Sequence, residues 1–415
     1  MIQTLNLNNE KRWILYDWAN SVFAVSVMSG FFPLLFRKYW AQSLESEEIT
    51  LYLGLTNSAL SFSLFFLLPF IGYIIDQKAK KPQRLLFMTA CLGALLTSSL
   101  FFISGGDYIQ ALLFYSFSFL FFAIGNTQYD GLLFKIAVKK DLNHLERLSS
   151  LGYLFGYLGG GVGLLLQSLV IIFHKQLGFE SPLLPAKIAF LSTALWWILF
   201  SIPLLKLKVI RSDEESSLPF FKQSIVFLKS LDKKTLFFLG AFFLYIDVVY
   251  TAYKMAADFG LSVGLSQNEL IAALLYVQII AVPGTYIMLL ISQKLGTKKS
   301  LYFGLSCYAI VLLLSPFTKT PLMFFLLATF IGLAQGGIQS LSRSYFSKLI
   351  GEDMQGLGFG FLNVFGKLSA VLGPAIMGLT AYVFKDHSLS VLALFPFLAF
   401  GALMLHLSFK EDKTY

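Results

Sequence analysis

The stretch WILYDWANSVFAVSVMSGFFPLLF, residues 13–36, decides the fold class. It is a mostly apolar run, at least as long as the roughly 20 residues that a helix needs to cross a bilayer. It is too long for the apolar region of a cleavable signal peptide, so we expect it to remain as a membrane-spanning helix. No lipidation motif is evident at either end of the sequence.

Further apolar runs of similar length follow along the chain. The 415 residues are 56% hydrophobic and 13% charged, whereas soluble domains carry about 25% charged residues. We therefore expect an all-α membrane protein. The predicted spans number twelve and cover residues 13–36, 50–75, 84–104, 108–136, 148–173, 183–205, 235–257, 267–291, 300–317, 321–345, 356–384 and 388–409.

Lysine and arginine are distributed unequally between the predicted loops. If the N-terminus is cytoplasmic, the inside segments hold 24 of the 32 basic residues. The outside segments hold only 7, which are Arg37, Lys38, Lys175, Lys187, Lys254, Lys319 and Lys385. This bias predicts that both termini are cytoplasmic. It also accounts for the net charge of +9, so the sequence predicts no nucleic-acid partner.

The longest polar stretch, residues 206–234, divides six predicted spans from six. We expect residues 1–205 to form an N-terminal six-helix half and residues 235–415 a C-terminal one, with a cytoplasmic linker between them. Two pseudo-symmetric six-helix halves are typical of the major facilitator fold. Corresponding sequence segments of the two halves also resemble one another, as expected for an internal repeat.

Two carboxylates occupy corresponding places in the two halves. Asp17 aligns with Asp247, and Ser21 aligns with Thr251. An ionisable residue inside a span usually faces a cavity or a charged partner, so we predict that Asp247, and after it Asp17, binds solute or a proton. Two alternatives remain open: Asp17 could pair with the basic cytoplasmic rim, and Asp247 could pair with Lys254 to lock helices together.

Other polar residues inside the predicted spans are candidates to line a solute path. Buried amides need partners, so we expect these side chains to face the bundle interior, as path residues or as links between helices. Lys367 could neutralise Asp130, bind an anionic group of the solute, or extend to the cytoplasmic surface. The full set of path candidates is Asp17, Asn20, Ser21, Gln128, Asp130, Asp247, Thr251, Gln335, Gln339 and Lys367.

The remaining motifs indicate packing and no catalytic chemistry. Gly152, Gly156 and Gly160 recur every four residues and predict a helix-packing face. Cys91 and Cys307 are far apart in apolar runs, so we expect reduced thiols. Because no metal-ligand spacing and no nucleophile with a neighbouring base is evident, we expect no metal, no cofactor and no enzyme activity.

Four segments resemble one family. Tyr16-Asp-Trp-Ala-Asn-Ser21 closely resembles the helix 1 signature of the autophagy-related vacuole effluxer branch of the major facilitator superfamily. Residues 156–160, 244–251 and 332–344 look like the motifs that the same family carries on its helices 5, 7 and 10.

Two positions depart from the family pattern. Val248 stands where the family tends to have glycine. The facilitator loop at residues 72–81 lacks its arginine and second glycine, so its gating role is carried over to Asp76 alone. Arg343, in the helix 10 motif, is the second predicted gating residue.

The resemblance implies alternating access around a site at the membrane midplane. For the eukaryotic relatives it also implies efflux of amino acids from the vacuole. We therefore expect a monomeric secondary transporter of a small polar solute, amino acids first, coupled to protons, in the inner membrane of a bacterium. Other hypotheses are a carrier of a siderophore, nucleoside or drug-like solute, and a membrane scaffold or sensor that transports nothing.

Overall fold

The computed structural model describes residues 2–78, 81–136, 142–209, 220–350 and 355–410. All regular structure in these ranges is helical, and 12 helices are long and apolar enough to cross a membrane. The all-α prediction with twelve spans is therefore confirmed. The spans are Asn8–Trp40, Ser46–Leu68, Pro82–Phe102, Tyr108–Leu133, Leu151–Ile172, Leu183–Lys206, Lys233–Ser262, Gln267–Leu295, Thr297–Phe317, Pro321–Ile350, Phe365–Phe384 and His387–Lys410.

The chain folds into two compact units. Unit 1 comprises residues 1–43 and 67–217, and unit 2 comprises residues 44–66 and 218–415. Helix α3 (Ser46–Lys78) is therefore divided: residues 46–66, which hold nearly all of the second span, belong to unit 2, and residues 67–78 belong to unit 1. The predicted linker, residues 206–234, lies partly outside the described residues and contains helix α8.

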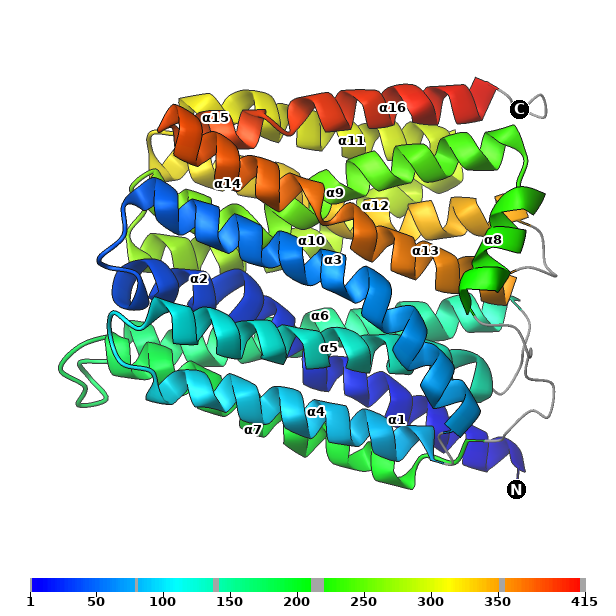
Figure 1. Ribbon diagram of the computed structural model, residues 1–415, viewed down its shortest axis with the longest axis horizontal. Helices are drawn as coiled ribbons and strands as arrows, with labels where there is room; N and C mark the ends of the chain where they lie inside the picture. Colours follow the sequence, from blue (N-terminus) through cyan, green and yellow to red (C-terminus); the bar gives the residue numbers. More distant parts are fainter. Residues whose placement is uncertain (1, 79–80, 137–141, 210–219, 351–354, 411–415) are drawn as a thin grey trace. The chain divides into compact units, whose positions relative to one another are not determined.

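Unit 1 contains eleven helical elements, counting the later part of α3, over the described residues (Figure 1). They are α1 (Ile2–Val22), η1 (Phe23–Phe31), α2 (Phe32–Leu35), η2 (Phe36–Trp40), α3 (Ser46–Lys78), α4 (Pro82–Ser99), η3 (Leu100–Phe102), α5 (Tyr108–Ile136), α6 (Leu142–Ile172), α7 (Leu183–Ser201) and η4 (Ile202–Lys206). The first span is not the uniform α-helix that the sequence predicted, because η1 and η2 are π-helical. Such wide turns are frequent at functional sites.

The glycines of α6 bring this helix against α1. A Cβ on Gly159 would lie 2.5 Å from the carbonyl oxygen of Trp18, and one on Gly160 would lie 2.6 Å from a Val25 methyl group. Helices in lipid associate mainly through such close van der Waals contact. The predicted packing role of the glycine-rich segment is confirmed.

Unit 2 contains the first part of α3 and ten further helical elements over the described residues. They are α8 (Phe220–Ser230), α9 (Lys233–Ser262), α10 (Gln267–Leu295), α11 (Thr297–Leu314), η5 (Ser315–Phe317), α12 (Pro321–Ile350), α13 (Gln355–Ser369), α14 (Leu372–Phe384), α15 (His387–Leu392) and α16 (Phe395–Lys410). Side-chain caps begin two of the long helices. Asp232 accepts from the Thr235 amide at 2.9 Å to start α9, and Ser266 forms a capping box with Glu269 to start α10.

The eleventh span is broken, where the sequence predicted one continuous helix over 356–384. α13 ends at Ser369, and α14 begins at Leu372. Pro374 explains the break, because its ring cannot donate a hydrogen bond and collides with the carbonyl four residues earlier, that of Ala370. The bundle therefore contains a helix N-terminus inside a span.

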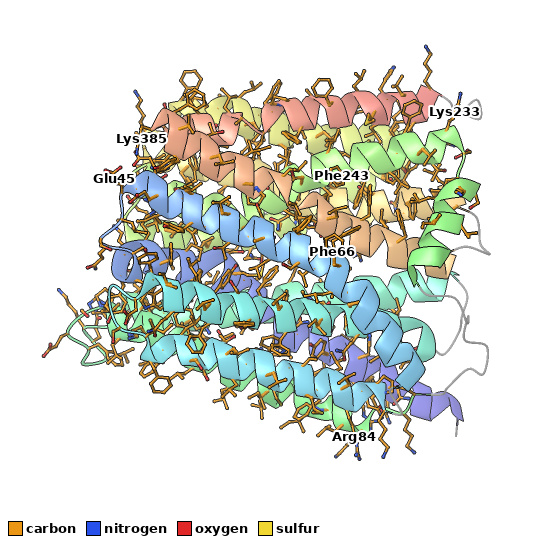
Figure 2. All side chains as sticks on the ribbon, in the orientation of Figure 1. Glu45, Phe66, Arg84, Lys233, Phe243 and Lys385 are labelled. Carbon is orange, nitrogen blue, oxygen red and sulfur yellow. The ribbon has the colours of Figure 1, made fainter. Side chains whose placement is uncertain are left out.

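Within unit 2, the first part of α3 crosses α14 at backbone distance. A Cβ on Gly54 would collide with the carbonyl oxygen of Pro374, and a Cβ on Gly378 would lie 3.0 Å from the Cα of Leu51. The two ends of the unit are well separated: Glu45 and Lys385 lie at one end, and Lys233 lies at the other (Figure 2). This crossing places polar residues of α3 beside α9.

Candidate functional site

Helix α9 carries a buried polar stripe in unit 2. Asp247, Thr251, Lys254 and Asp258 are spaced by four, three and four residues, so they share one face of the helix. Their exposed fractions are 1%, 0%, 8% and 0%. A charged side chain at the centre of a span costs roughly 2.5–3.5 kcal/mol on insertion scales. A stripe with three ionisable groups is therefore the strongest candidate site in this unit.

Asp247 has two unlike carboxylate oxygens. Oδ1 accepts the backbone N–H of Gly373 at 3.0 Å and the hydroxyl of Thr251 at 3.5 Å. Oδ2 is buried and has no hydrogen-bond partner among the described residues. The site therefore holds one oxygen firmly and leaves the other available to a proton or a solute donor.

The broken eleventh span supplies the donor to Asp247. Gly373 is the second residue of α14, where backbone N–H groups have no partner within the helix. The N-terminal end of a helix also carries partial positive charge, which favours a carboxylate beside it. Glycine is required here because a Cβ at this position would collide with the hydroxyl of Thr251.

Lys254 is the cation of the stripe. Its Nζ donates to the hydroxyl of Ser61 on α3 at 3.1 Å, and its charge attracts that of Asp247. Lys254 and Lys187 were counted with the outside segments, although the predicted spans 235–257 and 183–205 include them, and that count was wrong. Both lie inside spans, Lys254 in α9 and Lys187 in α7.

Unit 1 holds the corresponding carboxylate, Asp17. Its Oδ1 accepts from Ser21 at 3.3 Å, and a Cβ on Gly156 would lie 3.0 Å from that oxygen. Asn20, 2% exposed, donates its side-chain amide to that of Asn126. The predicted polar stripe of α1 is thus in contact with both α5 and α6.

Gln128 on α5 is the least satisfied of the predicted path residues in unit 1. It is 6% exposed, and neither its amide nitrogen nor its oxygen has a hydrogen-bond partner among the described residues. Asp130, two residues on, is half-buried. A buried amide without a partner costs about 1–3 kcal/mol, which an incoming polar solute could offset.

The tenth-helix motif lies on α12 in unit 2. Gln335 is buried, and Gln339 and Arg343 are half-buried. Ser342 bonds the hydroxyl of Tyr245 on α9 at 2.7 Å, so this motif packs against the helix that carries Asp247. The glycine pair Gly336-Gly337 contacts the neighbouring α10, at Thr285 and Met288.

Lys367 and Asp76 are predicted residues whose proposed roles are not tested by the described contacts. Lys367 is half-buried on α13, and its suggested pairing with Asp130 stays a prediction. Asp76 lies near the end of α3, but its side chain falls outside the described side chains, so its gating role also stays a prediction.

Four residues of this region were not predicted. Thr50 and Ser61 contact the α9 stripe, Asp258 belongs to it, and His387 contacts Thr50. The signal for Asp258 was present, since it continues the spacing of Asp247, Thr251 and Lys254. The others could not be found without knowing that α3 and α15 pack on α9.

Comparison with known proteins identifies the family of this chain. A family model described as "Vacuole effluxer Atg22 like" matches residues 48–413. The chain belongs to this vacuole effluxer family. The resemblance of the motifs on the first, fifth, seventh and tenth spans is thereby confirmed.

Two relatives illustrate matches that extend along most of both chains. The MFS-type transporter YxiO of Bacillus subtilis is 32% identical over 413 residues, which cover 98% of this chain and 96% of the relative. Autophagy-related protein 22 of Eremothecium gossypii is 24% identical over 451 residues, with 93% and 87% covered. The protein is accordingly a membrane transporter of the major facilitator type.

Solved structures show the same fold. The nucleoside transporter NupG superposes with a TM-score of 0.69 at 13% identity, covering 99% of this chain and 100% of the other. A bacterial homologue of the lysosomal transporter Spinster, in an inward-facing conformation, gives a TM-score of 0.68 at 14% identity, with 99% and 97% covered. At such identities the likeness establishes the major facilitator fold and nothing about the solute.

Proposed function

We propose that this vacuole effluxer family member is a secondary active transporter that moves a small polar solute by alternating access, in exchange or symport with protons. Amino acids are the first solute class to test. Its setting is the inner membrane of a bacterium, with both termini in the cytoplasm, as the distribution of basic residues predicts. Its partners are the solute, protons and the bilayer.

Asp247 carries the proposal. A buried carboxylate with one oxygen that has no hydrogen-bond partner in the described part of the chain can take a proton or a donor group of the solute and release it again. Its other oxygen is held by the N-terminus of α14. Protonation would replace a charge-assisted bond to Gly373 by a weaker neutral one, so occupancy of Asp247 would alter the contact between α9 and α14.

The polar groups of unit 2 suit a solute with charges of both signs, because the carboxylate Asp247 and the cation Lys254 lie on one face of α9. Within unit 1, the path candidates are the Asp17 carboxylate and the amides of Asn20 and Gln128. An amino acid carries an ammonium group and a carboxylate. In this proposal Gln335 and Gln339 of α12 line the path, and Arg343 and Asp76 gate it.

Uptake into proteoliposomes tests the proposed function. Labelled amino acids are screened with and without an imposed pH gradient, with wild type beside Asp247→Asn. Glu180→Gln is the matched control, because it makes the same carboxylate-to-amide change in an exposed loop. We expect gradient-dependent uptake in wild type and control, and its loss in Asp247→Asn.

Other outcomes discriminate between the alternatives. Retained gradient-driven uptake in Asp247→Asn would move the coupling site to Asp17. No amino-acid flux, but flux of nucleosides, siderophores or drug-like solutes in a wider screen, would replace the solute class. No flux of any of them by folded protein would favour a scaffold or sensor.

A further inference from the structure

We propose that His387, Thr50, Asp258 and Lys254 form a proton relay between one end of unit 2 and Asp247. The inference rests on the proposed proton coupling and names its route. The relay begins at the end of the unit where Glu45 and Lys385 lie (Figure 2). In the predicted orientation this is the extracytoplasmic end.

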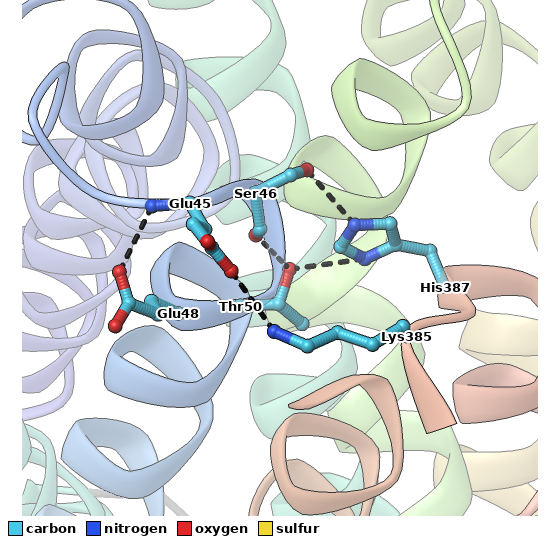
Figure 3. Close-up of polar contacts among 6 residues, drawn as sticks. All are labelled: Glu45, Ser46, Glu48, Thr50, Lys385 and His387. Carbon is cyan, nitrogen blue, oxygen red and sulfur yellow. Dashed lines mark hydrogen bonds and ion pairs between the residues drawn. The ribbon is translucent and has the colours of Figure 1, made fainter. Parts of the chain in front are cut away.

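The outer part of the relay joins three helices. Thr50 on α3 donates its hydroxyl to Asp258 Oδ2 on α9 at 2.6 Å. The same hydroxyl lies 3.3 Å from Nδ1 of His387 on α15. The opposite ring nitrogen, Nε2, lies 2.9 Å from the hydroxyl of Ser46, so the imidazole contacts both Ser46 and Thr50 of α3 (Figure 3). The Thr50 hydroxyl is the link from the imidazole to the Asp258 carboxylate.

Burial separates this arrangement from a surface cluster. Thr50 and Asp258 are both 0% exposed, while His387 and Ser46 are partly exposed. An imidazole at the boundary, followed by a hydroxyl and a buried carboxylate, leads inward from solvent. Chains of Asp, Glu and His inside membrane proteins are typical of proton relays, since each such group is costly to bury.

The inner part of the relay runs along α9. Asp258 and Lys254 are four residues apart and therefore neighbours on the helix surface. Side chains on a helix lean towards its N-terminus, so the Asp258 side chain leans towards Lys254, and the Lys254 side chain leans towards Thr251 and Asp247. The whole path from Asp258 to Asp247 covers about 16 Å, at about 1.5 Å per residue.

The other charged groups near His387 are engaged elsewhere. Asp386 caps α15 by accepting the amides of Ser388 and Leu389 at 2.7 and 3.2 Å. Lys385 pairs with Glu45 at 2.9 Å, and Glu48 accepts the Glu45 amide at 2.9 Å (Figure 3). Asp258 is thus the buried carboxylate that His387 reaches, through the Thr50 hydroxyl.

Each transfer in the relay conserves protons and moves no electrons. The imidazolium of His387 gives its Nδ1 proton to the Thr50 oxygen, while the Thr50 hydroxyl passes its own proton to Asp258. Asp258 then holds the proton as a carboxylic acid. The Lys254 ammonium gives a proton to Asp247 and regains one from Asp258, so one proton has moved inward.

A pair of variants at Thr50 tests the relay. Thr50→Val removes the hydroxyl and keeps the shape, whereas Thr50→Ser keeps the hydroxyl. Each of these variants, and His387→Gln, is purified and reconstituted separately. The matched histidine control is His406→Gln, which changes an exposed residue of α16. Two rates are compared for a labelled amino acid that wild type transports: uptake driven by a pH gradient, and exchange across the membrane without one.

We expect Thr50→Val and His387→Gln to lower gradient-driven uptake by about a hundredfold or more, the scale on which a positioned proton-transfer group acts. Exchange, which needs no net proton movement, should persist and shows that the variants fold. Thr50→Ser and His406→Gln should resemble wild type. Equal gradient-driven uptake in Thr50→Val and Thr50→Ser would overturn the relay.

Infrared difference spectroscopy decides the relay even if no amino acid is transported, which would be a failure of the proposed function alone. Acidification of the reconstituted protein should produce carboxylic-acid bands, one lost in Asp247→Asn and one lost in Asp258→Asn. His387→Gln should shift the second. An acid spectrum unchanged by Asp258→Asn would mean that Asp258 never holds a proton, and would overturn the relay.

Discussion

Asp247 Oδ1 lies 3.0 Å from the backbone nitrogen of Gly373, the second residue of a helix that begins inside the membrane span. This contact joins the buried carboxylate of α9 to the break between α13 and α14. A charged acceptor strengthens a hydrogen bond and a neutral one weakens it. The charge on Asp247 and the position of α14 should therefore depend on one another.

Replacement of Gly373 tests this contact. Gly373→Ala places a methyl group against the hydroxyl of Thr251, and overpacking of this kind costs about 1–3 kcal/mol. We expect a lower unfolding temperature in detergent, partly restored in the double variant with Thr251→Ala. Gly366→Ala in α13 is the control, because its Cβ would meet Phe242 at an ordinary 3.5 Å. Equal effects at the two glycines would argue against the crowded site.

The attraction between Asp247 and Lys254 can be measured by a double-mutant cycle. Asp247→Asn and Lys254→Met each leave one buried charge without its counter-charge, which is strongly destabilising. The double variant removes both charges, so we expect it to lose less stability than the two single variants added together, by about 0.5–3 kcal/mol. Additive losses in denaturant unfolding would show that the two charges do not interact.

The number and places of the spans were predictable, because an uninterrupted run of about 20 apolar residues is typical of a membrane-spanning helix. The break at residues 370–371 was missed, although Gly373-Pro374 marked it. A proline can kink a helix or end it, and which occurs depends on neighbours such as Asp247. The π-helical stretch of the first span left no sequence signal that we can identify.

The candidate site was only partly predictable, because its contacts depend on which helices pack together. Asp247 and Asp17 stood out singly, as carboxylates inside apolar runs. Lys254 was counted with the outside segments as a topology signal, although it falls in the predicted span 235–257; the structure buries it against Ser61. His387 lies near a span end in sequence, and only the packing of α15 on α3 brings it to Thr50.

Two glycines of α6 that lie two residues apart provide a test of the packing in unit 1. Gly159→Ala would force a methyl group onto the backbone of Trp18, whereas a Cβ on Gly161 meets nothing within 4 Å. We expect Gly159→Ala to destabilise the protein by about 1–3 kcal/mol. Gly161→Ala should be neutral or slightly stabilising, because alanine favours the helix. Thermal unfolding of the two purified variants compares them, and the reverse order would contradict the close contact.

The ion pair of Lys385 and Glu45 should not respond to pH in the physiological range. The hydrogen bond that Lys385 donates to Glu45 raises the pKa of Lys385, and a raised pKa in the folded state contributes stability that is lost only as the pH rises through it. The difference in unfolding temperature between wild type and Glu45→Gln should stay constant from neutral pH to about 10.4, the ordinary lysine pKa, and then shrink. A change near neutral pH would contradict this assignment.

Proton coupling through Asp247 is tested most directly by measuring the movement of protons and solute in the same vesicles. Proteoliposomes that contain a trapped pH indicator are given, on the outside, the amino acid that the uptake screen identifies. Because Asp247 is proposed to bind the coupled proton, we expect solute entry to change the internal pH in wild type and Glu180→Gln, and to leave it unchanged in Asp247→Asn. Solute entry without any pH change in wild type would contradict proton coupling through Asp247.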